Sequence, residues 1–324
     1  MSLFFRKKNQ HLRLACGITP TGINAAVMTC DDENVPQIAH SIHCPFNTKD
    51  NWRDAQQQIT AFIEEYKLQH ADCYGVFSEK HYQLILLDAP NVPEEEQLAA
   101  VRWKIKDLIA IDIDDTVIDI FPHPTKKMLY AAVSDKALVQ CFVNFIRAVK
   151  LNLMSIDIEE LACRNVFERH PCNERGVAVV LLRENEGKLL IFNQSKLYLS
   201  RRFNLHYDGD THNALPEEEL MVELQRSLDY YERQVGQTVP RDMLFCGKVS
   251  EDQISSTIKN SFQQRLAHIN INDILHCASS TVDPLNILML SGAALRGLAP
   301  SNTTLTATAS SLIGTQEHIH ATGS

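Results

Sequence analysis

The sequence of 324 residues lacks several patterns that usually reveal a protein's chemistry. It contains no apolar run of the roughly 20 residues that cross a bilayer, and its net charge of −9 argues against nucleic-acid binding. The nine cysteines form no C-x-x-C pair and the thirteen histidines form no H-E-x-x-H motif, so no metal site is expected. Neither a P-loop nor a G-x-S-x-G nucleophile elbow is present. The odd number of cysteines favours the cytosol.

What the sequence does contain is typical of a soluble globular protein. Apolar residues make up 44% of the chain and charged residues 22%, and the length suffices for two domains. The first ten residues, MSLFFRKKNQ, place apolar residues before basic ones, which is not the order of a signal peptide. Two interpretations of Met1–Lys8 stay open, namely contact with an anionic inner leaflet and an unstructured basic start. Residues 301–324 are rich in Ser and Thr and predict a flexible tail.

The order of apolar and polar segments predicts an α/β fold with two similar halves. Strands 12–16 and 23–30 form one predicted hairpin, and strands 177–182 and 189–192 form a second. Each hairpin is followed by further strands and amphipathic helices, which suggests two related domains that face each other across a cleft. The predicted helices cover residues 54–67, 94–109, 135–150, 159–169, 216–235 and 251–265, and a final segment, 285–298, completes the fold. In the second of these, Leu98, Val101, Ile105, Leu108 and Ile109 are expected to face inward.

One helix carries the strongest motif in the chain. The segment EELMVELQRSLDYYERQ, Glu218–Gln234, resembles a helix of PilM-like proteins, the cytoplasmic actin-fold components of type IV pilus machines. Four further segments resemble the MshI branch, which serves the MSHA pilus, and they occur in matching order. These are Ala100–Ile109, Tyr130–Val139, Ser155–Asn165 and Ser291–Pro300. The resemblance extends over roughly residues 12 to 300.

The resemblance implies an actin-like fold of the FtsA/PilM type. It implies a first domain over residues 11–158, after the basic segment 1–10, with an extra subdomain at about 83–156. The second domain would cover 159–300, with its last segment, 285–300, returning to the first. In PilM-like proteins a groove beside the extra subdomain binds the N-terminal peptide of the inner-membrane protein PilN. A PilN-like partner, further pilus machine components and a cytoplasmic location at the inner membrane are therefore expected.

The first nucleotide loop of an active PilM-like protein reads like G-I-D-I-G-S-S-S-V-K. When this loop is aligned with residues 15–24, Gly17 stands at the metal-directing Asp and Thr19 stands at the second Gly. Asn24 stands at the Lys. Thr19 and Thr21 retain hydroxyl groups that could reach a phosphate. The carboxylate and the cation of the loop are missing.

The other two nucleotide loops are also incomplete. In the second hairpin, Leu181 and Arg183 stand where a Mg²⁺-holding Asp and a phosphate-approaching Gly are required. The third loop of the family contains G-G-G, and here only Gly247 remains. Three residues persist on the helix face that lies beside the ribose and base in relatives, and they could equally serve packing and internal ion pairs. They are Glu223, Arg226 and Ser227.

These losses predict a pseudo-ATPase scaffold. Without the two carboxylates, Mg²⁺ cannot neutralise charge during phosphoryl transfer, so no hydrolysis and no required cofactor are expected, while weak ATP binding stays open. A nucleotide-switched ATP-binding protein and an FtsA-like filament protein are the alternatives. Trp103, flanked by Arg102 and Asp107, is a candidate partner anchor. The alternative for Trp103 is that it covers the neighbouring subdomain sheet.

Overall fold

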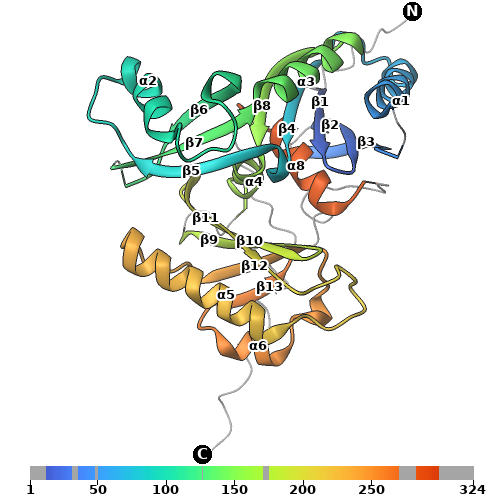
Figure 1. The fold of residues 1–324 in the computed structure, drawn as a ribbon. Helices are drawn as coiled ribbons and strands as arrows, with labels where there is room; N and C mark the ends of the chain where they lie inside the picture. The colour runs from blue at the N-terminus through green and yellow to red at the C-terminus, as the bar shows by residue number, and fades with distance from the viewer. Residues whose placement is uncertain are drawn as a thin grey trace, which may run out of the picture.

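The computed structural model describes residues 12–30, 36–47, 50–125, 127–170, 175–269 and 282–298. Its first domain is built on a five-stranded sheet in the order β3-β2-β1-β4-β8 (Figure 1). The strands are β1 (Arg13–Thr19), β2 (Gly22–Cys30), β3 (Pro36–Pro45), β4 (Asp72–Phe77) and β8 (Asn152–Ile158). Helices α1 (Asn51–Glu65) and α3 (Lys136–Ala148) pack on this sheet through an apolar core that includes Ile59, Phe62 and Phe142.

A separate subdomain is inserted between β4 and β8. It contains the 3₁₀ turn η1 (Glu79–His81), β5 (Tyr82–Asp88), α2 (Glu94–Ile105), η2 (Ile113–Asp115), β6 (Thr116–Pro122) and β7 (Met128–Asp135). Its strands form an antiparallel sheet in the order β5-β7-β6, onto which α2 packs through Val101 and Ile105. The predicted inward position of Leu98 and Leu108 is wrong, because both are exposed. The helix ends at Ile105, before Leu108, and buries only a narrow stripe.

The second domain repeats the hairpin-first plan around the sheet β11-β10-β9-β12-β13. Its strands are β9 (Val177–Arg183), β10 (Glu186–Asn193), β11 (Lys196–Asn204), β12 (Asp242–Gly247) and β13 (Arg265–His268). Helix α5 (Glu217–Tyr230) continues as a π-helical turn over Tyr231–Val235. The helix predicted at 251–265 is wrong. The chain instead forms the 3₁₀ turn η5 (Glu251–Gln253), the short helix α6 (Ser256–Ser261) and then β13, whose Leu266 and Ala267 are buried in the sheet.

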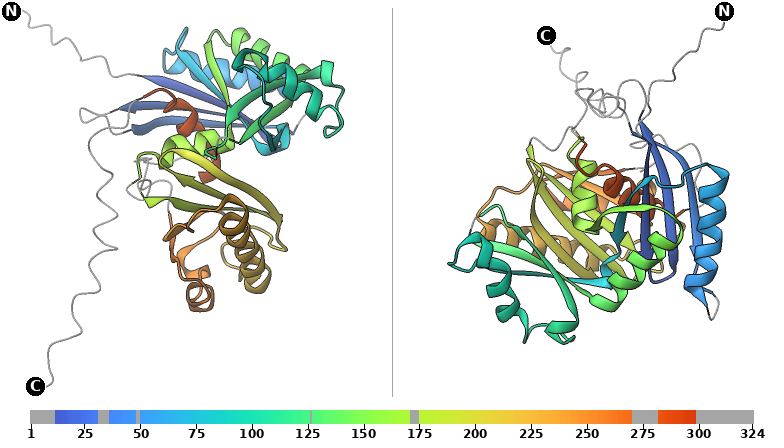
Figure 2. Two further views of the ribbon diagram at one scale, coloured as in Figure 1. Left: turned by 90° about the vertical axis from the view of Figure 1, so that its left-hand side faces the viewer. Right: turned by 90° about the horizontal axis from the view of Figure 1, so that it is seen from above.

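Two helices fill the space between the domain sheets. Helix α4 (Glu159–Phe167) packs against α8 (Pro284–Ala294), and α8 also contacts β1, β2 and β4 of the first domain (Figure 2). The helices approach so closely that a Cβ on Gly292 would lie 1.9 Å from the carbonyl oxygen of Ala162, so the position requires glycine. Apolar residues of both sheets, including Val76 and Val179, join these helices in one core.

Two features predicted from the sequence lie outside the described residues. These are the membrane contact of Met1–Lys8 and the tail 301–324. Within the described ranges, no helix combines the length and the apolar character that a membrane span requires.

Candidate functional site

The turns of the two domain hairpins face one another across a cavity of about 500 Å³. Residues 19–21, between β1 and β2, line one side, and residues 183–186, at the end of β9, line the other. Glu79 of η1 and Glu159, the first residue of α4, complete the wall between them. The three loops that the sequence aligns with a nucleotide site therefore converge here, with Lys248 beside Gly247 also lining the cavity.

Apolar side chains surround Gly17, which the sequence aligns with the metal-directing carboxylate of the first loop. A Cβ added to Gly17 would lie 3.0 Å from Cγ1 of Val76 and 3.3 Å from Cδ2 of Leu290 on α8. Both contacts are tighter than ordinary packing, so an aspartate at this position would have to displace core side chains. The neighbouring hydroxyl groups are engaged within the turn, because Thr19 donates to the carbonyl oxygen of Gly22 at 3.0 Å and lies 3.2 Å from Thr21 Oγ1.

Leu181, which the sequence aligns with the Mg²⁺-holding carboxylate of the second loop, lies in the protein core. Leu181 is completely buried in the apolar cluster that connects the two sheets, together with Leu285 and Leu288 of α8. Its neighbour across the β9–β10 ladder is Lys188, so the two side chains project from the same face of the sheet. Where an active hairpin requires a carboxylate, this hairpin therefore has an aliphatic side chain beside a lysine.

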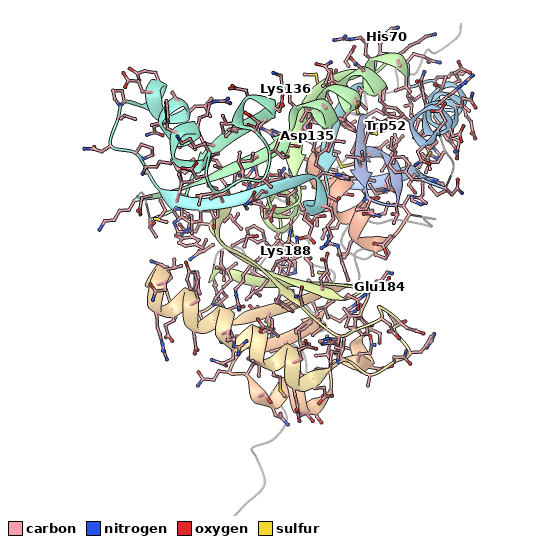
Figure 3. All side chains as sticks on the ribbon, in the orientation of Figure 1. Trp52, His70, Asp135, Lys136, Glu184 and Lys188 are labelled. Carbon is pink, nitrogen blue, oxygen red and sulfur yellow. The ribbon has the colours of Figure 1, made fainter. Side chains whose placement is uncertain are left out.

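Lys188 is the centre of a buried ion cluster between the domains (Figure 3). Its Nζ lies 2.7 Å from Glu79 Oε2, 3.1 Å from Glu160 Oε1 and 3.3 Å from Glu159 Oε2, and its side chain is only 3% exposed. Burial alone would lower the pKa of Lys188, but the carboxylates of Glu160, Glu159 and Glu79 outweigh burial and raise it. The lysine is therefore held as a cation.

Neutral donors and a helix terminus complete the coordination of these carboxylates. Tyr82 donates its hydroxyl to Glu160 Oε2, and Ser200 donates to Glu160 Oε1 at 2.9 Å. Burial favours the protonated acid, yet Lys188 and Tyr82 together lower the pKa of Glu160 below its ordinary value. Glu159 and Glu160 are also the first two residues of α4, where the helix dipole favours negative charge.

Arg183 occupies the place of the phosphate-approaching glycine. Its Nη2 lies 3.0 Å from each carboxylate oxygen of Glu159, and only 22% of the arginine side chain is exposed. The pKa of Arg183 is raised despite burial, because Glu159, Glu79 and Glu186 surround it with negative charge. The guanidinium of Arg183 therefore binds the carboxylate of Glu159 within the chain.

A more open set of ion pairs continues the cluster toward the surface. Glu186 lies 2.7 Å from Lys80 Nζ and 3.7 Å from Arg202 Nη2, and Arg202 Nε lies 3.9 Å from Glu79. Although burial opposes the change, the neighbours of Glu186 in the cluster, including the cations Lys80 and Arg202, lower its pKa to about 2. The Lys80–Glu186 and Arg202–Glu79 pairs each connect a residue of the first domain with a residue of the second.

The residues expected beside an adenosine are bonded to one another and to Arg201. Arg201 of β11 donates to the backbone oxygen of Glu223 at 3.0 Å and to its carboxylate at 2.9 Å, and also donates to Ser227 Oγ. Arg226 binds the other carboxylate oxygen of Glu223 at 2.7 Å. Gly247 has a φ of +105°, and a Cβ there would lie 2.4 Å from the carbonyl oxygen of Leu182. These residues therefore have structural roles in this domain.

The candidate partner anchor lies far from this cluster, on α2. Trp103 is 73% exposed, and Lys106 Nζ lies 4.7 Å from the centroid of its ring. The interpretation that Trp103 covers the subdomain sheet is therefore wrong. Arg102 donates to the carbonyl oxygen of Ile113 at 2.8 Å and pairs with Asp114 at 3.5 Å, while Asp107 is exposed.

Sequence reasoning identified the positions of the three loops but missed the ion cluster. Lys188, Glu79 and Glu160 come from segments far apart in the chain, and no motif connects them. One signal was available. Lys188 directly precedes the apolar run of β10, and Glu159 and Glu160 open a helix whose other residues are mostly buried.

Comparison with solved structures identifies the fold. No known protein family and no curated protein sequence matches the chain. A PilM–PilN type IV pilus biogenesis complex is 16% identical, with 89% of this chain and 99% of that chain covered and a TM-score of 0.64. The cytoplasmic domain of EpsL, an inner-membrane component of the type II secretion system of Vibrio cholerae, is 11% identical, with 90% and 98% covered and a TM-score of 0.53.

A third solved structure supports the same conclusion. A Bacteroides thetaiotaomicron protein with an actin-like ATPase fold and unknown function is 9% identical, covers 83% of this chain and 95% of that chain, and has a TM-score of 0.50. Identities this low show a shared fold alone. The predicted actin-like ATPase fold is confirmed.

Proposed function

We propose that this chain is a non-catalytic scaffold of an MSHA-type type IV pilus machine, of the MshI branch of PilM-like proteins. It works in the cytoplasm at the inner membrane and binds the N-terminal peptide of a PilN-like partner. The observation that carries this proposal is the cleft, where Leu181 and Leu290 pack at the two metal positions and Arg183 and Lys188 bind internal carboxylates. The motifs in Glu218–Gln234 and the fold shared with a PilM–PilN complex support the pilus assignment.

The proposed absence of ATP hydrolysis follows from the electrostatics of the cleft. Phosphoryl transfer requires charge neutralisation at the phosphates, usually by Mg²⁺ held by carboxylates. Five carboxylates and three Lys or Arg cations line the remaining cavity, so its charge balance opposes a nucleoside triphosphate. A triphosphate would also compete with Glu159 for Arg183.

The first domain is the proposed partner-binding domain. Among the residues that the structure describes, seven of the nine exposed large apolar side chains belong to residues before α4, and only Val222 and Tyr230 belong to the second domain. Trp103 is the most exposed of them, with charged Arg102 directly before it and Asp107 four residues after it. An aromatic side chain that is exposed and flanked by charges is typical of an anchor residue at a protein interface.

The decisive experiment is calorimetric titration of the full chain with Mg²⁺-ATP, and separately with the N-terminal peptide of its PilN-like partner. The proposal expects heat from the peptide and none from the nucleotide. A scrambled peptide of the same composition is the control. Micromolar, Mg²⁺-dependent ATP binding would overturn the pseudo-ATPase assignment and favour the nucleotide-switched alternative.

A further inference from the structure

The Lys188 cluster connects three separate parts of the molecule. Glu79 belongs to η1 of the first domain, Glu159 and Glu160 open the α4 helix between the sheets, and Lys188 belongs to β10 of the second domain. One ammonium group therefore contacts carboxylates on both sides of the domain boundary.

The charges of the cluster are balanced, and its central groups, Lys188, Glu79 and Glu160, are buried. Four carboxylates, those of Glu79, Glu159, Glu160 and Glu186, meet four cations. The cations are Arg183, Lys188, Lys80 and Arg202. Removing one partner from such a buried set leaves an uncompensated charge, which is strongly destabilising. The cluster is therefore stable only while the domains hold every member in place.

The cation at the centre is part of the chain and is not exchangeable. In the described ranges, no group of three or more His, Cys, Asp and Glu side chains is placed to hold a metal ion. The three carboxylates instead surround Nζ at distances of 2.7 to 3.3 Å, which are hydrogen-bonding distances for an ammonium group. The side chain of Lys188 extends toward them from beside Leu181, which supplies no charge.

We infer that Lys188 is a built-in cationic clasp, which holds the first domain and α4 closed against the second domain without any bound ligand. Domain closure in this chain is then constitutive and is not gated by a nucleotide. The inference depends on the ion cluster alone, so it stands or falls independently of the pilus assignment.

The clasp is tested by removing the ammonium group of Lys188 by substitution and then adding a small alkylammonium ion from solution. In Lys188→Ala the unfolding equilibrium constant is expected to rise about a hundredfold or more, because three carboxylates lose their cation. Propylammonium chloride should then raise the unfolding midpoint of this variant, since the adjoining cavity gives access to Glu79 and Glu159. Sodium chloride at equal ionic strength controls for screening, and propanol controls for the alkyl group.

Lys196→Ala is the matched control variant, because Lys196 is an exposed lysine on β11 of the same domain. It should unfold like the wild type and show no selective response to propylammonium. Equal responses of Lys188→Ala and Lys196→Ala to the amine would overturn the clasp. A Lys188→Met variant as stable as the wild type would also overturn it.

If Lys188→Ala does not fold, Glu79→Gln decides, because it keeps the side-chain size and removes one carboxylate charge. The clasp requires a lower unfolding midpoint together with a larger radius of gyration in small-angle X-ray scattering. If either quantity stays at the wild-type value, the inference is wrong.

Discussion

The cleft and the outer surface of α2 both contain charged and aromatic residues. These residues are buried and bound to internal partners in the cleft, and they are exposed on α2. In the cleft, Lys188 and Glu160 are almost completely buried and bind partners from within the chain. On α2, Trp103 is 73% exposed and contacts the ammonium of Lys106. The difference shows that the charged groups of the cleft stabilise the protein, whereas the charged and aromatic groups of α2 remain exposed and available for contacts with other molecules.

The largest expected effect comes from restoring a carboxylate to the cleft. Leu181→Asp would add a further carboxylate to the apolar core, next to a lysine that three carboxylates already surround, so the free energy of unfolding should fall by about 3–5 kcal/mol. Urea unfolding followed by circular dichroism measures this. Leu108→Asp is the surface control and should change stability by less than about 0.5 kcal/mol, because Leu108 is 59% exposed. A stable Leu181→Asp variant that gained Mg²⁺-dependent ATP binding would contradict this view of the cleft.

A smaller effect is expected when the cleft carboxylates are protonated. The pKa of Glu186 is about 2, below its ordinary value of 4.5, so its stabilisation is complete above pH 4.5 and is lost as the pH falls toward 2. After allowance for solvent screening, the loss is about 1–2 kcal/mol. Urea midpoints measured across this pH range test the prediction.

The Glu186→Gln variant isolates this acid transition from other titrating groups. Its stability should depend less on pH between 4.5 and 2 than that of the wild type. Burial lowers the pKa of His81, so protonation of His81 favours the unfolded state once the pH falls below about 6.5. That loss of stability begins at a higher pH than the loss caused by Glu186. Identical pH profiles for the variant and the wild type would show that Glu186 is not held by the cluster.

The smallest effect on stability is expected on α2, where binding should change instead. Trp103→Ala should alter the free energy of unfolding by less than about 0.5 kcal/mol, since the ring is mostly exposed. Its affinity for the PilN-like partner should fall about tenfold, or 1.4 kcal/mol, if the ring is an anchor. Tyr230→Ala, an exposed aromatic of the second domain, is the control. Equal affinities of the two variants for the partner would remove Trp103 from the proposed interface.

Much of the fold was predictable because its signals are local. Both hairpins are visible as apolar runs separated by polar turns, and their strands form in the structure as β1–β2 and β9–β10. The errors occurred where local patterns were ambiguous. The sequence of residues 251–265 predicts one helix, but α6 ends at Ser261. The chain then becomes extended, and Leu266 and Ala267 pair with β12 as part of β13.

The sequence by itself determined which groups are missing from the nucleotide loops, since a residue type at an aligned position is a local property. Gly17, Leu181 and Arg183 could all be identified in this way. Only the tertiary structure decided what occupies the vacated space. Leu290 packs beside Gly17 from the far end of the chain, and Lys188 meets Glu79 across the domain boundary. Such contacts depend on how two domains close around α4 and α8, and short-range sequence patterns carry no information about that packing.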